Sequence, residues 1–210
     1  MRTRSEQKRR DIVRVAAKAF EELGYERTSM LTIAERLRGS KQTLYNYFPS
    51  KEDLLRAVLD FDVGEVANHA LQEFLAEKNL RKALIRLGVA FLNGQLAPPA
   101  MSNIRIVSTQ PADSNLGEEF YENVLRPAWV RVADTFKALM NEGKLKRADP
   151  WLAAMQWKGL VLLDLFERRL LGAMKAPDSK EIEAAAKGAA DAFLKIYGPD
   201  DAEPKAGSRS

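Results

Sequence analysis

The chain has 210 residues, 46% of them hydrophobic, which suffices for one medium domain or two small domains with a packed core. It has no cysteine and one histidine, which excludes disulfides and zinc–thiolate sites and leaves little for metal binding or acid–base catalysis near neutral pH. Residues 1–56 carry 13 basic and 8 acidic side chains, whereas residues 57–210 carry 20 and 21, so the net charge of +4 divides into +5 and −1. A positive end on a balanced chain suits a phosphate-binding module and equally a solubilising terminus.

Apolar residues recur every three or four positions along almost the whole chain, and no alternation typical of strands appears. We therefore expect an all-α protein with about nine helices. The first helix carries an apolar stripe and ends at Gly24, which can adopt the left-handed conformation of a C-cap. Ser29 is the expected N-cap of a short second helix, and Ser40 that of a short third helix, Lys41–Phe48. A long fourth helix is expected to start at Lys51.

The later helices are predicted to be longer and to be joined by short loops. Proline pairs, glycines and capping residues, with Ser179 opening the last helix, place them at about 80–96, 98–108, 116–141, 150–171 and 179–197. Pro127 lies inside the third of these helices and should kink it. Residues 198–210 are rich in Pro, Gly, Ser and charge, so we expect them to form a disordered tail.

The second and third helices are each about two turns long and are joined by a tight turn containing Gly39, which is the geometry of a helix-turn-helix. Only Leu44 and Phe48 of the third helix are needed for the core. Its outward face is expected to carry Lys41, Gln42, Thr43 and Tyr47. Lysine can donate to guanine, glutamine can pair with adenine, a threonine methyl can touch thymine, and a phenol suits a phosphate. Phosphates of the second DNA strand would be close to Lys51 and to a basic cluster that comprises Arg2, Arg4, Lys8, Arg9 and Arg10.

Several of these side chains also have a purely structural explanation. Tyr45 fits packing as well as a phosphate contact, and Thr43 can simply support the helix cap. Arg2 and Arg4 can belong to a disordered end of the chain. The DNA-binding interpretation therefore depends on the whole pattern rather than on any one residue.

An ordered set of residues runs through this part of the chain: Ala16-Ala17, Phe20, Gly24-Tyr25, Ile33-Ala34, Gly39-Ser40-Lys41, Thr43-Leu44-Tyr45, Tyr47-Phe48 and Ser50-Lys51-Glu52. Over about residues 8–60 the sequence resembles the DNA-binding domain of TetR/AcrR-family regulators. The resemblance implies base contacts from Lys41, Gln42 and Thr43, on a helix that Ser40 caps. It also implies contact with, or positioning on, the DNA backbone for Ser29, Tyr45, Tyr47 and Lys51. Arg38 departs from the usual turn of the family, and it fits either a phosphate contact or exposure to solvent.

We expect a helix-turn-helix DNA-binding domain over 6–56, with the motif itself at about 29–48, and a ligand-sensing and dimerisation domain over 57–197. An apolar cavity between helices is the usual ligand site in a bundle, and the resemblance implies an effector site in the same part of the chain. The residues expected there are Asn103, Arg105, Tyr121, Trp129, Gln156, Trp157 and Asp164. Asp164 interrupts an apolar run, so a buried carboxylate there would need an arginine, a ligand or solvent. The sequence leaves open whether it belongs to the pocket or to a subunit interface.

The last predicted helix carries small residues that permit close approach of another helix: Ala184, Ala185, Ala186, Gly188, Ala189, Ala190 and Ala192. Together with the helix over 150–171, it predicts a four-helix homodimer interface, as the resemblance also implies. Packing on its own subunit is the alternative. A two-fold dimer would place two recognition helices about 34–36 Å apart, which matches an approximately palindromic double-stranded operator.

These features predict a sequence-specific DNA-binding transcriptional regulator, most simply a repressor released by an apolar small-molecule effector, with no metal and no cofactor. A ligand-independent regulator or architectural DNA-binding protein is one alternative. An all-α enzyme is another, because Glu65 and His69 lie one turn apart with Asp62 nearby, although a solvated helix face explains them equally. The basic first residues and the lack of a run of roughly 20 apolar residues predict neither a secretory signal nor a membrane anchor, and therefore a cytoplasmic protein.

Overall fold

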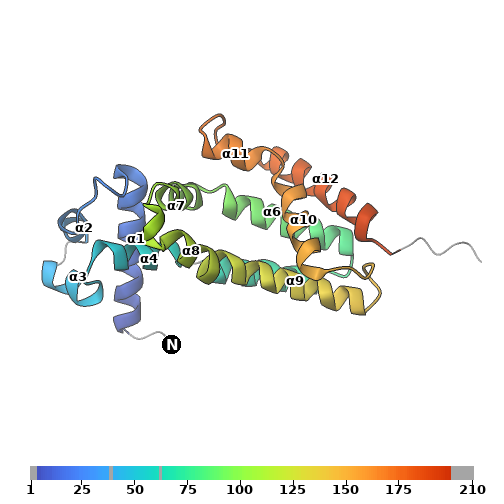
Figure 1. Ribbon diagram of the computed structural model, residues 1–210, viewed down its shortest axis with the longest axis horizontal. Helices are drawn as coiled ribbons and strands as arrows, with labels where there is room; N and C mark the ends of the chain where they lie inside the picture. Colours follow the sequence, from blue (N-terminus) through green and yellow to red (C-terminus); the bar gives the residue numbers. More distant parts are fainter. Residues whose placement is uncertain (1–3, 38–39, 62, 200–210) are drawn as a thin grey trace, which may run out of the picture. The chain divides into compact units, whose positions relative to one another are not determined.

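The computed structural model describes residues 4–37, 40–61 and 63–199, and within these residues all regular structure is helical (Figure 1). The α-helices are α1 (Arg4–Leu23), α2 (Met30–Arg36), α3 (Lys41–Tyr47), α4 (Lys51–Leu59), α5 (Val63–Ala76), α6 (Leu80–Gln95), α7 (Pro98–Ser108), α8 (Leu116–Phe120), α9 (Arg126–Asn141), α10 (Pro150–Leu162), α11 (Leu165–Leu170) and α12 (Ser179–Tyr197). A 3₁₀ turn at Ala112–Ser114 and a π-helical segment at Tyr121–Leu125 complete them. The predicted all-α class is confirmed.

The chain forms two compact units that are each built from separate segments. Unit 1 comprises Met1–His69, Asn93–Ala128 and Leu165–Ala176, and unit 2 comprises Ala70–Leu92, Trp129–Asp164 and Pro177–Ser210. Helices α1 to α4 therefore share unit 1 with α7, α8 and α11, whereas α10 and α12 belong to unit 2.

The loop between α1 and α2 is fixed by backbone geometry and by a buried hydroxyl. Gly24 has φ of +84°, a conformation that glycine adopts without strain, and it ends α1 as the sequence predicts. Thr28 is buried, and its Oγ1 donates to the carbonyl oxygens of Gly24 at 2.8 Å and Ala19 at 3.3 Å. Ser29 then caps α2, since its Oγ accepts from the amide of Thr32 at 3.1 Å. These bonds determine where α2 begins.

One apolar core holds the four N-terminal helices together and continues into α7 and α8. The buried side chains include Ile12, Val13, Ala16, Phe20, Ile33, Ala34, Leu44, Phe48, Leu54, Leu55, Val58, Leu59, Ile106, Leu116 and Phe120. The last three of these come from α7 and α8, which pack against α1 and α4, so the N-terminal helices share their core with helices much further along the chain.

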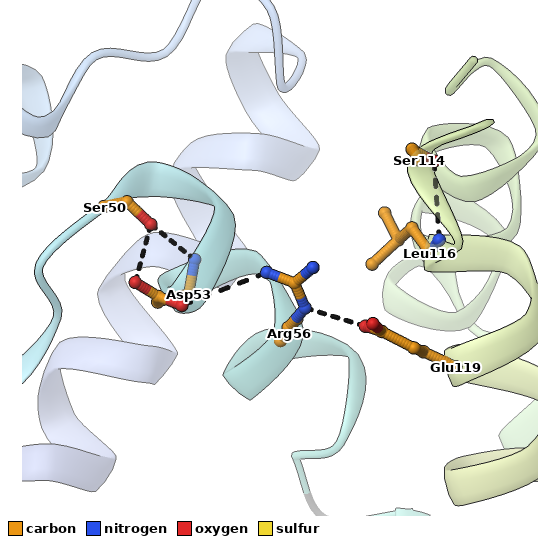
Figure 2. A network of polar contacts seen from close by, with 6 residues as sticks. All are labelled: Ser50, Asp53, Arg56, Ser114, Leu116 and Glu119. Atoms are coloured by element: carbon orange, nitrogen blue, oxygen red, sulfur yellow. Dashed lines mark hydrogen bonds and ion pairs between the residues drawn. The ribbon is translucent and has the colours of Figure 1, made fainter. Parts of the chain in front are cut away.

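A polar network accompanies this apolar contact between α4 and α8 (Figure 2). Ser50 caps α4 by accepting from the amide of Asp53 at 3.0 Å, and its hydroxyl donates to the Asp53 carboxylate at 2.7 Å. One turn later, Nε of Arg56 donates to Oε2 of Glu119 on α8 at 2.7 Å. The pair is nearly half exposed, so it orients the two helices more than it stabilises them.

Two helices are shorter than the sequence predicts. The expected long fourth helix ends at Leu59, because the amides of Asp60 and Phe61 donate to Arg56 and Val58 in a tightened turn, and α5 begins at Val63. The expected helix over 150–171 is also interrupted.

That second interruption lies at Leu163, which has φ of +47° and ψ of −131°. A leucine rarely adopts positive φ, and the chain resumes as α11 only at Leu165. No proline or glycine marks this break in the sequence, which is why the helical pattern predicts continuity across it.

Pro127 is accommodated by a widened turn within the predicted helix over 116–141. The amide of Arg126 donates to the carbonyl of Tyr121, five residues earlier, and the segment Tyr121–Leu125 is π-helical. Proline lacks an amide hydrogen, and its ring clashes with the carbonyl four residues before it in a regular α-helix. The structure therefore has a π segment ahead of the predicted kink position.

Unit 2 is held by close contacts of α12 with α6 and α10. A Cβ added at Gly88 on α6 would lie only 3.0 Å from Cβ of Ala186 on α12, so a larger residue at this position would require one of the two helices to shift. Arg81 and Asp191 join the same two helices through a two-bonded ion pair at 2.6 and 2.8 Å. The N-cap of α12 is Asp178 rather than Ser179, and it forms a capping box with Glu181.

The predicted disordered tail over 198–210 lies outside the described residues from position 200 onward. Among the helices that the structure describes, none has both the length and the apolar character needed to cross a bilayer.

Candidate nucleic-acid interface

Helix α3 is positioned by a cap at its start and by two apolar side chains. Oγ of Ser40 accepts from the amide of Thr43 at 3.1 Å and lies 2.8 Å from the Thr43 hydroxyl. Leu44 and Phe48 are 1% and 3% exposed and belong to the core of unit 1. Both caps that the sequence predicts, Ser40 and Ser29, are confirmed.

The opposite face of α3 is open to solvent. Lys41, Gln42 and Tyr45 are exposed, and Thr43 is half-buried against its cap. Nε2 of Gln42 donates to Oδ1 of Asn46 at 3.0 Å, so two amide side chains lie side by side on this face. The sequence interpretation missed Asn46, although its spacing of four residues from Gln42 is the available signal.

The first turns of α1 lie beside α3. The hydroxyls of Ser5 and Tyr47 are 3.4 Å apart, and the guanidinium of Arg9 lies 5.1 Å from the ring centroid of Phe48. Arg4 is exposed and Lys8 is half-buried, whereas Arg2 lies outside the described residues. The exposed face of α3 therefore adjoins a basic helix start, an arrangement that attracts phosphates.

Lys51 is engaged inside the protein. Its Nζ donates to the carbonyl of Tyr25 at 3.1 Å and lies 4.1 Å from the centroid of the Tyr25 ring. Burial raises the pKa of Tyr25 to about 12, and the nearby carboxylates of Glu52 and Glu26 act in the same direction. Lys51 thus ties the start of α4 to the loop before α2. The expected turn residues Arg38 and Gly39 lie outside the described residues.

Three of the expected effector-site residues belong to unit 1. Asn103 is half-buried on α7, and Tyr121 is exposed at the start of the π segment. The guanidinium of Arg105 donates to the carbonyls of Leu170 at 2.8 Å and Arg169 at 3.1 Å, at the C-terminal end of α11. Arg105 therefore caps α11, which satisfies carbonyls that the helix itself leaves unpaired.

The other four expected residues belong to unit 2, where the structure brings two of them together. The rings of Trp129 and Trp157 are 6.5 Å apart, and Phe91 on α6 lies 5.0 Å from the first and 6.3 Å from the second. Gln156 is exposed and accepts a hydrogen bond from the hydroxyl of Tyr197. Asp164 is exposed directly after the break at residue 163.

Lys158 joins this ring cluster and was missed by the sequence interpretation. Its Nζ lies 5.6 Å from the centroid of the Trp129 ring, and burial lowers its pKa. The available signal was that Lys158 is the one charged residue of α10.

The residues of the enzyme alternative are only partly described. Asp62 lies outside the described residues, nothing is described for the side chain of Glu65, and His69 is exposed on α5. Within the part of the chain that the structure describes, no three acidic or histidine side chains gather as metal ligands would.

Two protein-family models match the chain. The model for bacterial regulatory proteins of the tetR family matches residues 12–58, and the model for the C-terminal domain of AefR-like transcriptional repressors matches residues 82–199. The HTH-type transcriptional repressor ComR of Escherichia coli K12 is 39% identical over 79 residues. That match spans 37% of the chain but only 38% of the length of ComR.

Solved structures match over nearly the whole chain. A protein from Mesorhizobium loti MAFF303099, described as a TetR-family transcriptional regulator, is 28% identical with a TM-score of 0.85, covering 94% of this chain and 100% of that one. The flavonoid-responsive regulator FrrA is 27% identical with a TM-score of 0.69, covering 93% and 100%. Because one family model spans more than half of the 210 residues and another covers the helix-turn-helix, the chain belongs to the TetR family of bacterial regulatory proteins.

Proposed function

We propose that this protein is a sequence-specific transcriptional repressor that binds an approximately palindromic DNA operator as a homodimer and releases it when an apolar small molecule binds. The observation that carries the proposal is the division of α3 into two faces. Leu44 and Phe48 hold one face in the core, while Lys41 and Gln42 are exposed on the other. A short helix with this division is suited to enter the major groove.

We assign the roles within the interface from the chemistry and the exposure of the side chains. Lys41, Gln42 and Thr43 read base edges, and Tyr45 and Tyr47 reach the DNA backbone. Ser29, Ser40 and Lys51 act mainly by positioning, because their polar groups already bond within the protein. The DNA-binding domain spans 6–56, and residues 57–197 form the ligand-sensing and dimerisation domain.

Helices α10 and α12 of unit 2 support the homodimer. Each exposes a large aliphatic side chain, Leu152 on α10 and Ile196 on α12, both about half exposed. Gly188 is also exposed on α12, where it permits another helix to approach closely. An isologous dimer through these helices would give the operator its two-fold symmetry.

The effector acts by shifting a population. A ligand that binds the DNA-free arrangement more tightly lowers operator affinity, with a coupling of about 1–3 kcal/mol. The similarity to FrrA, a flavonoid-responsive regulator, supports an apolar effector. No cofactor is required for this mechanism, and the protein acts in the cytoplasm, where the DNA is.

The test begins with selection of bound sequences from random duplexes, followed by affinity measurements by fluorescence anisotropy. Gln42→Ala should cost about 1–3 kcal/mol on the selected duplex and little on competitor DNA, because it removes a base contact. Lys41→Ala should also weaken binding to the selected duplex, whereas Lys137→Ala, which removes an exposed lysine on α9, is its charge-matched control and should leave affinity unchanged. If about six or more phosphates are engaged, affinity should fall by roughly 10³-fold or more between 50 and 200 mM salt. No preference for any duplex over competitor would refute the proposal.

A further inference from the structure

Three aromatic rings of unit 2 pack against one another, and those of Trp129 and Trp157 are buried. Phe91 and Trp129 are arranged edge to face at 77°, and Trp157 is tilted by 57° to Phe91 and by 49° to Trp129. The rings come from α6, α9 and α10 (Figure 1), and the three residues all belong to unit 2. Such a cluster provides apolar contact area for a planar molecule.

Trp157 carries a hydrogen-bond donor that the described protein does not use. The side chain is 1% exposed, and its Nε1 is buried with no acceptor within the described residues. Buried indole N–H groups usually have a partner, because leaving one unpaired costs its full desolvation. The ring is also held close, since its Cζ2 would lie 3.6 Å from a Cβ at Gly88. The donor is therefore fixed in place and, among the described residues, lacks an acceptor.

Lys158 brings a positive charge to the same cluster. Its ammonium is half-buried over the Trp129 ring, and no carboxylate lies within ion-pair distance of it among the described residues. Lys187, by contrast, pairs with Glu183 at 3.0 Å on the surface of α12. Burial lowers the pKa of Lys158. A partly desolvated cation of this kind favours an anion as its partner.

We propose that unit 2 binds an aromatic anion, a carboxylate or phenolate, whose ring packs on Phe91 and Trp129 while its oxygens pair with Lys158 and accept from Nε1 of Trp157. The proposal rests on the effector-responsive function above and adds the charge and shape of the effector. A cationic effector is disfavoured, because Lys158 already covers a face of Trp129 and would repel a second positive charge.

Two probes of nearly equal shape test the charge. 1-Naphthoate carries a carboxylate where 1-naphthamide carries a neutral amide, and both can be titrated against the full-length protein by calorimetry. Naphthoate should bind about 10-fold or more tightly than naphthamide, because a hydrogen bond to a charged group is the stronger one. Lys158→Met should abolish this preference and leave naphthamide binding unchanged. Lys137→Met, which removes an exposed lysine of the same unit, should leave the preference intact.

The donor is tested with Trp157→Phe, which keeps the aromatic body and removes the N–H. It should weaken both probes by about 3- to 10-fold, since both carry an acceptor oxygen. Thermal unfolding of each variant checks its fold, and Lys158→Gln replaces Lys158→Met if the methionine variant is unfolded. A preference for naphthoate that survives in Lys158→Met or Lys158→Gln overturns the proposal, and so does the failure of wild-type protein to bind either probe.

Operator affinity separates this inference from the function on which it rests. If the protein binds its selected duplex and naphthamide or another neutral molecule releases it as readily as naphthoate, only the anionic character of the effector is refuted. If no duplex is selected, the regulator function itself fails, whatever the probes do.

Discussion

The close approach of α6 and α12 at Gly88 leads to a quantitative stability prediction. An alanine Cβ there would lie 3.0 Å from Cβ and 3.4 Å from Cα of Ala186, whereas one at Gly94 on the same helix would meet nothing within 4 Å. Alanine is favoured over glycine within a helix by about 1 kcal/mol, and overpacking typically costs about 1–3 kcal/mol. We therefore expect Gly94→Ala to stabilise by up to about 1 kcal/mol, and Gly88→Ala to destabilise by a net ~0–2 kcal/mol.

Urea unfolding followed by circular dichroism measures both changes. Protein concentration must be constant, because association of subunits makes the apparent stability depend on it. The unfolding midpoint should fall for Gly88→Ala and rise for Gly94→Ala. Adding Ala186→Gly to Gly88→Ala removes the overlapping methyl group, and since one helix then gains an alanine where the other loses one, the stability should return close to that of the wild type.

Two results would refute this reasoning. Gly88→Ala could stabilise as much as Gly94→Ala, which would mean that α6 and α12 are not in close contact. The double variant could be less stable than Gly88→Ala alone, which would mean that the methyl group of Ala186 is not the obstacle. Trp157 adjoins Gly88, so its fluorescence should shift in Gly88→Ala and remain unchanged in Gly94→Ala.

A double-mutant cycle of Arg56→Ala and Glu119→Ala should give a coupling of about 0.2–1 kcal/mol that shrinks with salt, as both side chains are nearly half exposed; zero coupling at low salt would contradict the ion pair. Leu163→Gly should raise the melting temperature, because it relieves about 1 kcal/mol or more of backbone strain at a side chain that is 60% exposed, and a lower melting temperature would count against that strain. The pKa of Tyr25 is raised from 10.0 to about 12, so the folded protein keeps a proton that the unfolded chain releases and should lose stability as pH rises from 10 to 12. Unfolding of Tyr25→Phe at pH 9 and 11 should show a smaller loss. Asp178→Ala removes the N-cap of α12 and should cost about 0.5–2 kcal/mol in urea unfolding, an effect that Asp178→Asn should largely avoid.

Much of the fold could be predicted because local chemistry marks most helix ends. Gly24 and the caps Ser29 and Ser40 act through their own backbone or through an amide three residues away. The break at Leu163 could not be predicted, since leucine does not favour positive φ and neither neighbour is proline or glycine. Pro127 predicted an irregularity in the helix, but the sequence did not predict that a π-helical segment would precede it.

Some features of the candidate site could likewise be predicted from the sequence, and others could not. The exposure of Lys41 and Gln42 follows from the spacing of the apolar residues on α3. The engagement of Lys51 could not be predicted, because its partner is the carbonyl of Tyr25, a residue 26 positions earlier that only the folded chain brings close. Lys158 stood out as the single charge in its helix, but helical periodicity alone does not say which rings surround it.

Helix α3 has only seven residues, and most of what holds it in shape comes from side chains elsewhere in unit 1. A synthetic peptide of residues 40–48 should therefore be a random coil in water, since helix nucleation is unfavourable and so short a segment cannot offset it. Specificity could be transplanted between related repressors only by exchanging the outward side chains on an intact scaffold. The recognition helix of this protein therefore depends on the tertiary structure, and the isolated segment should not keep its helical conformation.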